Sequence, residues 1–143
     1  MHSGPLPPTY EELEIGILSL KDTASGSDGV PNGFFRHASL DYKTDLLELF
    51  NRSWNEGIIP VSWKSGVSLP FAKPGKDLHK VDSYRYITLL NTNGKLMERL
   101  VNKRLQYWLE KERKLGNYQY GFRPGRSTYD VLIQIEMYIR TAL

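Results

Sequence analysis

The chain contains 143 residues, of which 40% are hydrophobic and 24% charged, the composition of one globular domain or part of one. No run of about 18 apolar residues is present, so we expect no membrane span and no membrane partner. The sequence starts without a secretory signal pattern and contains no cysteine, which excludes disulfides, thiolate metal sites and cysteine nucleophiles. We therefore expect an intracellular protein, in the nucleus or the cytoplasm.

The net charge of +3 is distributed unevenly along the chain. Residues 1–60 carry 4 basic and 9 acidic side chains, a net of −5, whereas residues 61–143 carry 15 basic and 7 acidic side chains, a net of +8. Aromatic residues are interleaved with the basic ones in the second part, a pattern that suits binding to a polyanion such as a nucleic acid. A solvated basic face is the alternative, and charge alone does not distinguish them.

Three helices are predicted in the first 60 residues. Thr9 and Glu12 have the spacing of a capping box, which begins a helix that runs to about residue 21. A loop rich in Gly and Ser follows, then a short helix over residues 32–37 and a longer one over residues 42–56, ended by a glycine. Apolar residues at helical spacing predict the buried sides of the first and third helices: Leu13, Ile17, Leu18, Leu20, Leu46, Leu49, Phe50 and Trp54.

The basic part is predicted to contain a two-stranded antiparallel ribbon followed by two helices. Alternating apolar residues predict strands over residues 65–72 and 84–90, with a loop of residues 74–83 between them. The helices are expected over residues 91–114 and from residue 127 onward. Their apolar faces comprise Leu96, Leu100, Leu105, Trp108 and Leu109, and then Val131, Leu132, Ile135 and Ile139. The predicted fold class is α+β, mostly helical, with a small antiparallel ribbon.

The turn between the predicted strands concentrates cationic side chains. Lys73 and Lys76 flank a Pro-Gly pair, and Arg85 lies at the start of the returning strand. A tight turn holds such side chains near exposed backbone N–H groups, which is what a triphosphate or a backbone phosphate requires. A solvated hairpin tip with charged side chains is the alternative interpretation.

The most specific segment comprises residues 119–128, with the sequence QYGFRPGRST. Gly121 permits an unusual backbone angle or a close approach, and Phe122 offers a stacking face or a plug for the core. Arg123 and Arg126 flank a second Pro-Gly turn, where two cations could meet a nucleic acid.

The same segment leads into the last predicted helix. Ser127 is the expected N-cap of that helix, and Asp130 would complete a capping box. A helix N-terminus carries free N–H groups and partial positive charge, so this point can hold a phosphate. A well-capped loop-to-helix junction is the alternative, and the two interpretations are compatible.

Other polar and aromatic residues favour structural roles. Asp28, in an Asp-Gly-Val-Pro segment, is expected to stabilise a turn rather than to bind a ligand. His37 and His79 are isolated, without a second ligand at metal spacing, so the sequence predicts no metal site and no catalytic residue. Trp54 and Trp63 bracket a Gly-x-x-Pro segment and are expected to pack in the core.

In their order along the chain, six segments resemble the motifs of the reverse transcriptases of non-LTR (LINE-type) retrotransposons. The resemblance covers about residues 9–143, and the ordered set is much more specific than any single motif. The matching segments are residues 25–31, 54–64, 73–77, 84–91, 94–99 and 119–128.

This resemblance implies part of a right-hand polymerase, with residues 1–60 as an N-terminal helical lead-in and residues 61–143 as the fingers and the entry to the palm. It implies that Lys73 and Arg85 contact the incoming dNTP. It implies that Arg123 and Arg126 lie beside the template or the nascent base pair. Lys76, Gly121, Phe122 and Ser127 are further candidates for contact with the template or another nucleic acid. The implied partners are an RNA template, a DNA primer or RNA–DNA hybrid, dNTP, and the palm of the parent polymerase.

Two features depart from the family pattern. Tyr86 stands where the family usually has proline, which restores a backbone N–H and frees a backbone angle in the ribbon. The family transfers nucleotides with two Mg²⁺ ions held by palm aspartates, whereas this sequence contains no Asp-Asp pair. We therefore expect a fragment without the palm catalytic core, with no cofactor of its own and inactive alone. Without the palm, we expect the last two helices to leave apolar surface exposed at Trp108, Ile135, Ile139 and Leu143. The alternative is a stand-alone nucleic-acid-binding or protein-interaction domain derived from such an element.

Overall fold

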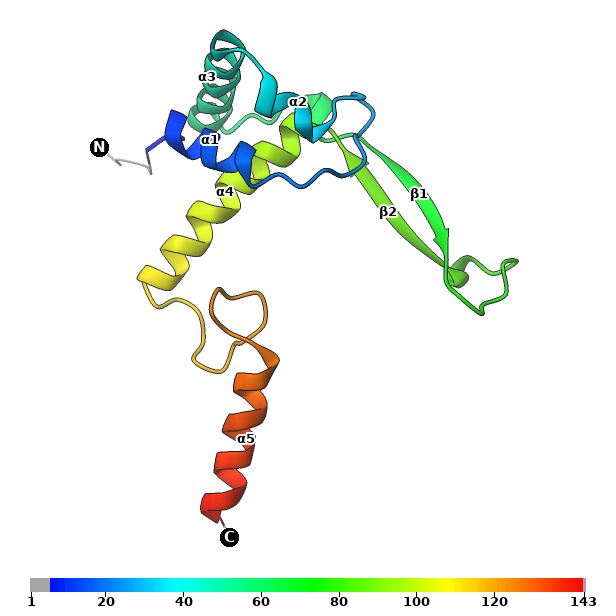
Figure 1. The fold of residues 1–143 in the computed structure, drawn as a ribbon, viewed down its shortest axis with the longest axis vertical. Coiled ribbons are helices and arrows are strands. Elements are labelled where there is room, and N and C mark those ends of the chain that lie inside the picture. Colours follow the sequence, from blue (N-terminus) through cyan, green and yellow to red (C-terminus); the bar gives the residue numbers. More distant parts are fainter. Residues whose placement is uncertain (1–5, 143) are drawn as a thin grey trace. The chain divides into compact units, whose positions relative to one another are not determined.

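The computed structural model describes residues 6–142, which form two compact units that divide between Val101 and Asn102. In chain order the elements are α1 (Tyr10–Leu18), α2 (Asn32–His37), α3 (Leu40–Glu56), β1 (Gly66–Ala72), β2 (Tyr84–Leu90), α4 (Thr92–Lys111) and α5 (Thr128–Ala142) (Figure 1). About half of the chain is helical and the strands form one antiparallel sheet, which confirms the predicted secondary-structure content. The division at residue 60, made from charge and family organisation, stays a prediction. Within residues 6–142 no helix combines the length and the apolar character needed to cross a membrane.

Capping side chains determine where the first helix begins and ends. The capping box predicted at Thr9 is present: the Glu12 N–H donates to Thr9 Oγ1 at 3.3 Å, and the Thr9 N–H donates to the Glu12 carboxylate at 2.8 Å. The helix ends at Leu18 rather than near residue 21. Ser19 forms its C-cap, and the Ser19 hydroxyl donates to the Gly16 carbonyl at 2.7 Å.

The bounds of α3 follow the same logic. The helix begins at Leu40, two residues before the predicted position. Ser39 is its N-cap, because the Ser39 hydroxyl accepts from the Tyr42 N–H at 3.3 Å. Gly57 ends the helix with φ of 67°, a left-handed conformation that glycine adopts without steric cost.

The hydrophobic core lies in the first unit and joins residues from both sides of the charge boundary. Its buried members are Leu13, Ile17, Leu20, Phe35, Leu46, Phe50, Trp63, Leu96, Met97 and Leu100. Phe50 and Trp63 meet edge to face, with ring centroids 5.5 Å apart, and this confirms the predicted core role of Trp63. Gly94 of α4 packs so closely that a Cβ there would lie 3.0 Å from the Trp63 Cβ.

Four residues predicted to face inward are exposed instead: Leu18, Leu49, Leu105 and Leu132, with exposed fractions from 41% to 70%. Trp108, Ile135 and Ile139 belong to the same apolar faces and are 49% to 56% exposed, which confirms the expectation that these three residues are left uncovered. Leu143, of which the same was expected, lies outside the described residues. Helical spacing places apolar residues on one side of a helix, but burial also requires a neighbouring element. In α5 no residue is buried, and most of its apolar side chains are exposed, although Val131 is half-buried.

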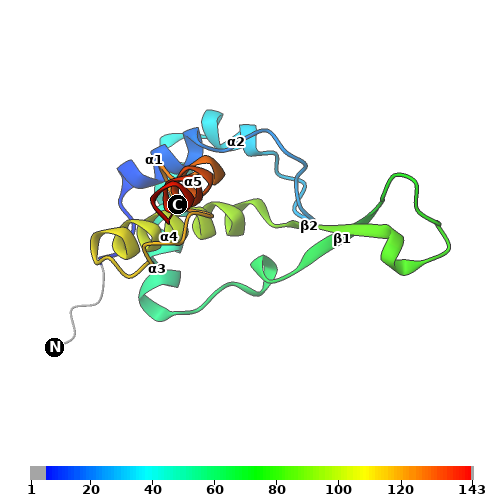
Figure 2. The ribbon, with the colours of Figure 1, turned by 90° about the horizontal axis from the view of Figure 1, so that it is seen from below.

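The β1–β2 ribbon extends away from the helices of the first unit, with its connecting loop at the far end (Figures 1 and 2). The strands pair from Gly66 opposite Leu90 to Ala72 opposite Tyr84, as predicted. Every residue of β1 is exposed. The ribbon therefore presents both faces and the loop to the surroundings.

Candidate nucleic-acid interface

The ribbon brings Lys73 and Arg85 to one face. Just past the ends of the strands, the Lys73 N–H donates to the Ser83 carbonyl at 2.8 Å, so residues 73 and 83 occupy a hydrogen-bonding position of the ladder, although the Ser83 N–H donates to the Lys80 carbonyl instead. Such positions recur at every second residue of an antiparallel ladder, so Phe71 and Arg85 occupy the next one. Because side chains alternate between faces, Phe71, Lys73 and Arg85 lie on the same side of the ribbon.

The cationic groups at this end differ in their surroundings. The Lys73 Nζ donates to the Asp82 carbonyl at 2.7 Å, which holds the half-buried ammonium beside the loop. Arg85 is exposed, and within residues 6–142 it makes no ion pair with Asp77, Asp82 or any other carboxylate. The planar guanidinium of Arg85 thus remains available to a phosphate.

Lys76 lies farther along the loop, where the Lys76 N–H donates to the Lys73 carbonyl at 3.3 Å and Gly75 adopts φ of 72°. Its side chain is exposed. The turn therefore places Lys76 in a flanking position, and the structure brings together only Lys73 and Arg85 of this set.

Tyr86 occupies a regular strand position opposite Pro70, and the register continues unbroken through this pair. Since residues 71 and 85 form a hydrogen-bonded pair, Pro70 and Tyr86 form a non-hydrogen-bonded one, and their backbone nitrogens point outward from the ribbon. A proline or a tyrosine at position 86 therefore leaves the β1–β2 ladder intact.

In the second unit, Arg123 is held inside the loop before α5. Its Nε and Nη2 donate to the two carboxylate oxygens of Glu110 at 2.8 and 2.7 Å, and its Nη1 donates to the carbonyls of Gly116 and Gln119. The side chain of Arg123 is only 10% exposed. The hydrogen bonds from Arg123 hold the pKa of the Glu110 carboxyl below its ordinary value. Arg123 therefore braces the loop, and a template contact by this residue stays a prediction.

The unusual backbone angles of the segment do not fall at Gly121, contrary to expectation. Gly121 has no positive φ, and a Cβ there would meet nothing within 4 Å. Gly125 has φ of 69° in the Pro-Gly turn, and Phe122 has φ of 60° with a fully exposed ring. Bulky residues rarely adopt such angles, and here the result is an aromatic ring that stands in solvent, where a base could stack on it.

The junction with α5 shows one of the two bonds of the predicted capping box, the one from the Ser127 backbone to the Asp130 side chain. The Asp130 carboxylate accepts from the Ser127 N–H at 2.6 Å and from the Ser127 hydroxyl at 3.0 Å. The negative charge of Asp130 thus already lies at the helix N-terminus, where the sequence also allowed a phosphate.

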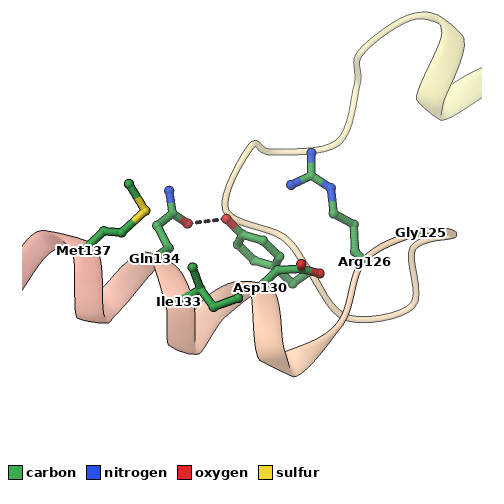
Figure 3. Close-up of a pocket in the computed structure, with 7 residues that line it drawn as sticks. Gly125, Arg126, Asp130, Ile133, Gln134 and Met137 are labelled. Carbon is green, nitrogen blue, oxygen red and sulfur yellow. Dashed lines mark hydrogen bonds between the residues drawn. The ribbon is translucent and has the colours of Figure 1, made fainter.

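Beside this junction lies an open cavity of about 300 Å³ (Figure 3). The Arg126 guanidinium lies over the Tyr120 ring, 5.3 Å from its centroid. The Tyr120 hydroxyl donates to Oε1 of Gln134, and this bond is drawn in Figure 3. The sequence motif indicated Arg126, but Tyr120 and Gln134 were missed because their contact joins a loop to the second turn of a helix.

The residues present do not fit the pair of Mg²⁺ ions that the family resemblance implies. Within residues 6–142 no group of three or more His, Cys, Asp or Glu side chains is placed to hold a metal ion. We therefore derive no step of chemistry through a metal in this chain.

Comparison with known proteins agrees with the motifs. No family model matches the chain. The chain is 33% identical over 137 residues to a probable RNA-directed DNA polymerase from transposon BS, and 34% identical over 129 residues to the RNA-directed DNA polymerase from mobile element jockey, both of Drosophila melanogaster. It is 31% identical over 129 residues to a putative 115 kDa protein in the type-1 retrotransposable element R1DM of the same fly.

These matches cover 95%, 89% and 87% of the chain but only 15%, 14% and 12% of the relatives. The chain thus spans about one seventh of the length of the polymerases that it matches. The predicted family is confirmed: over nearly its whole length, this chain is homologous to a segment of the reverse transcriptases of non-LTR retrotransposons.

Proposed function

We propose that this chain is the part of a retrotransposon reverse transcriptase fingers domain that holds the incoming nucleotide and the template, without the carboxylates that perform nucleotidyl transfer. The observation that carries the proposal is the shared face of Lys73 and Arg85 at the end of the ribbon. One ammonium is positioned by a loop carbonyl, and the neighbouring guanidinium has no ion-pair partner within residues 6–142. Together they can bind adjacent phosphate oxygens by charge-assisted hydrogen bonds.

In this proposal the second unit contributes the template contacts. Arg123 and Glu110 hold the loop, which leaves Phe122 and Arg126 as the exposed aromatic and cationic groups. Stacking on an aromatic ring and attraction of phosphates by cations are the two contributions that bind single strands without sequence preference.

The experiment is a pair of assays on the isolated chain. Fluorescence anisotropy with a labelled uridine decamer should give binding that weakens steeply with salt. If three to five phosphates are neutralised, log K against log salt should have a slope of roughly −2 to −3.5. Binding that does not change with salt, or no binding at low salt, would contradict the proposal.

Primer extension on an RNA template, with dNTP and Mg²⁺ or Mn²⁺, should give no product above a control without protein. The reason is that residues 6–142 contain no carboxylate cluster placed to hold the ions that activate the primer hydroxyl. Extension that survives repurification of the chain would show that the catalytic part of the proposal is wrong.

A second candidate is a stand-alone interaction domain, and one observation favours it. The exposed side of α5 is apolar, with Leu132, Ile133, Ile135 and Ile139 each at least half exposed. Exposed apolar surface of this kind often marks a protein contact. A monodisperse monomer that melts cooperatively, with this apolar side exposed, would support a stand-alone domain, whereas aggregation without a cooperative melt would support a segment whose partner surface lies elsewhere in a longer protein.

A further inference from the structure

The cavity beside α5 has a definite hydrogen-bonding character. Since Oε1 of Gln134 accepts from the Tyr120 hydroxyl, the amide group of Gln134 is oriented and offers its two N–H donors. Arg126 adds the N–H donors of its guanidinium, which makes no ion pair within residues 6–142. Gln134 and Arg126 thus offer several donors to the cavity, beside one acceptor, the Asp130 carboxylate.

Its other walls favour a flat ring over a phosphate. Tyr120 supplies an aromatic ring, over one face of which the Arg126 guanidinium lies, while Ile133 and Met137 supply apolar edges from α5 (Figure 3). The Asp130 carboxylate also lines the cavity, and its negative charge repels a phosphate at close range. The volume of about 300 Å³ is at the lower end of the range for small-ligand sites.

We propose that this cavity binds one unpaired base of the nucleic acid and prefers guanine, with Gln134 and Arg126 as the residues that select it. Guanine presents two adjacent acceptors, N7 and O6, to such donors, and arginine forms a bidentate contact with that edge. Adenine places its N6 donor beside N7, so it opposes the donors of the site. Tyr120 acts as a positioning residue, because its hydroxyl orients the Gln134 amide.

This inference rests on the proposed function, since it names the base preference of the same nucleic-acid contact. The test uses labelled RNA decamers of uridine in which position five is uridine, guanosine, adenosine or 7-deazaguanosine. We expect guanosine to raise the affinity about fivefold or more over uridine, the lower end of a bidentate base contact. Adenosine and 7-deazaguanosine should give little of this gain, although both stack as well as guanosine.

Variants separate base selection from charge. Gln134→Ala, Tyr120→Phe and Arg126→Lys should remove most of the preference for guanosine, and the last of these keeps the positive charge. Arg140→Ala is the matched control, because Arg140 lies on α5 in an exposed ion pair with Glu136 and does not line the cavity. It should weaken binding to all four RNAs alike.

The outcomes are distinguishable. If all four RNAs bind with equal, salt-sensitive affinity, the base preference is wrong while the proposed function stands. A gain with 7-deazaguanosine equal to that with guanosine would assign the effect to stacking and also overturn the inference. If the uridine decamer itself does not bind at low salt, the proposed function fails and the inference fails with it.

Discussion

The carboxylate of Asp28 accepts a hydrogen bond from the backbone N–H of Thr92, 64 residues later in the chain, at 2.8 Å. The Thr92 hydroxyl returns a bond to the Val30 carbonyl at 2.8 Å, and Thr92 is fully buried. Asp28 also accepts from the Val30 N–H at 3.4 Å, so it stabilises its own turn, as expected, and ties that turn to the first residue of α4. Its negative charge lies at the N-terminus of that helix, where it is favourable.

Asp28→Ala should lower the free energy of unfolding by about 1–2 kcal/mol, because it removes a cap and leaves a buried N–H without a partner. Urea denaturation followed by circular dichroism measures this. Asp45→Ala is the control, since Asp45 is an exposed residue of α3 and should change stability by about 0.5 kcal/mol or less. Equal effects of the two substitutions would mean that the Asp28–Thr92 bond does not stabilise the fold.

The Arg123–Glu110 pair predicts a pH dependence confined to the second unit. The hydrogen bonds from Arg123 lower the pKa of Glu110 in the folded state. A lowered pKa means that the stabilisation is complete above the unfolded-state pKa, which is near 4.5, and is lost as the pH falls below it.

Hydrogen exchange of residues 112–127 should therefore accelerate on acidification, after correction for intrinsic rates. In Glu110→Gln the loop should be less protected at neutral pH, and the difference from the parent should shrink toward pH 3. Glu112→Gln is the control, because Glu112 is exposed and makes no ion pair within residues 6–142. A constant difference across the pH range would refute the role of the Glu110 charge.

Arg85→Ala should weaken dNTP binding in a longer chain that includes the palm. Losing a charged hydrogen-bond donor to phosphate costs roughly 1.5–3 kcal/mol of affinity, while stability should hardly change because the side chain is exposed. Arg52→Ala removes an exposed arginine that pairs with Glu56 on α3, and it should leave dNTP affinity unchanged. If Arg85→Ala binds dNTP as tightly as the parent, Arg85 does not contact the nucleotide.

Proline substitutions in β2 should differ sharply between neighbouring positions. Tyr86→Pro should leave amide exchange in the ribbon nearly unchanged, because the Tyr86 N–H points away from β1. Ile87→Pro removes the N–H that faces Leu69, and should lower the free energy needed to open the ribbon by about 1–3 kcal/mol. Amide exchange at Val67 and Leu69, followed by NMR, makes the comparison. Similar loss of protection in both variants would contradict the hydrogen-bond alternation assigned here.

Local sequence signals predicted much of the fold. The capping box at Thr9, the left-handed Gly57 and the alternation of the two strands each depend on residues close together in sequence, and each is confirmed. Burial was less predictable: Leu49 and Leu105 have the spacing of core residues, yet both side chains are exposed. Whether a helix side is covered depends on contacts between distant segments.

The candidate site shows the same limit. Arg123 and Arg126 are equivalent in the motif, on either side of Pro-Gly, but only the structure shows that one is enclosed by Glu110 and the other exposed. Gln134 carried no signal at all, because its role follows from a hydrogen bond to a tyrosine fourteen residues earlier. The sequence motif indicated that cationic side chains are concentrated in this loop, but not which of them are exposed.

The backbone nitrogens of Pro70 and Tyr86 point outward from opposite edges of the ribbon. The two edges therefore differ in the hydrogen-bond donors that they offer to a further strand. Pro70 has no N–H to offer, so β1 resists the addition of a third strand. The family's usual proline at position 86 would protect β2 in the same way, whereas Tyr86 gives that edge a complete row of outward donors and acceptors. In this chain, strand addition, whether by a neighbouring segment or by a second copy, is therefore directed to β2.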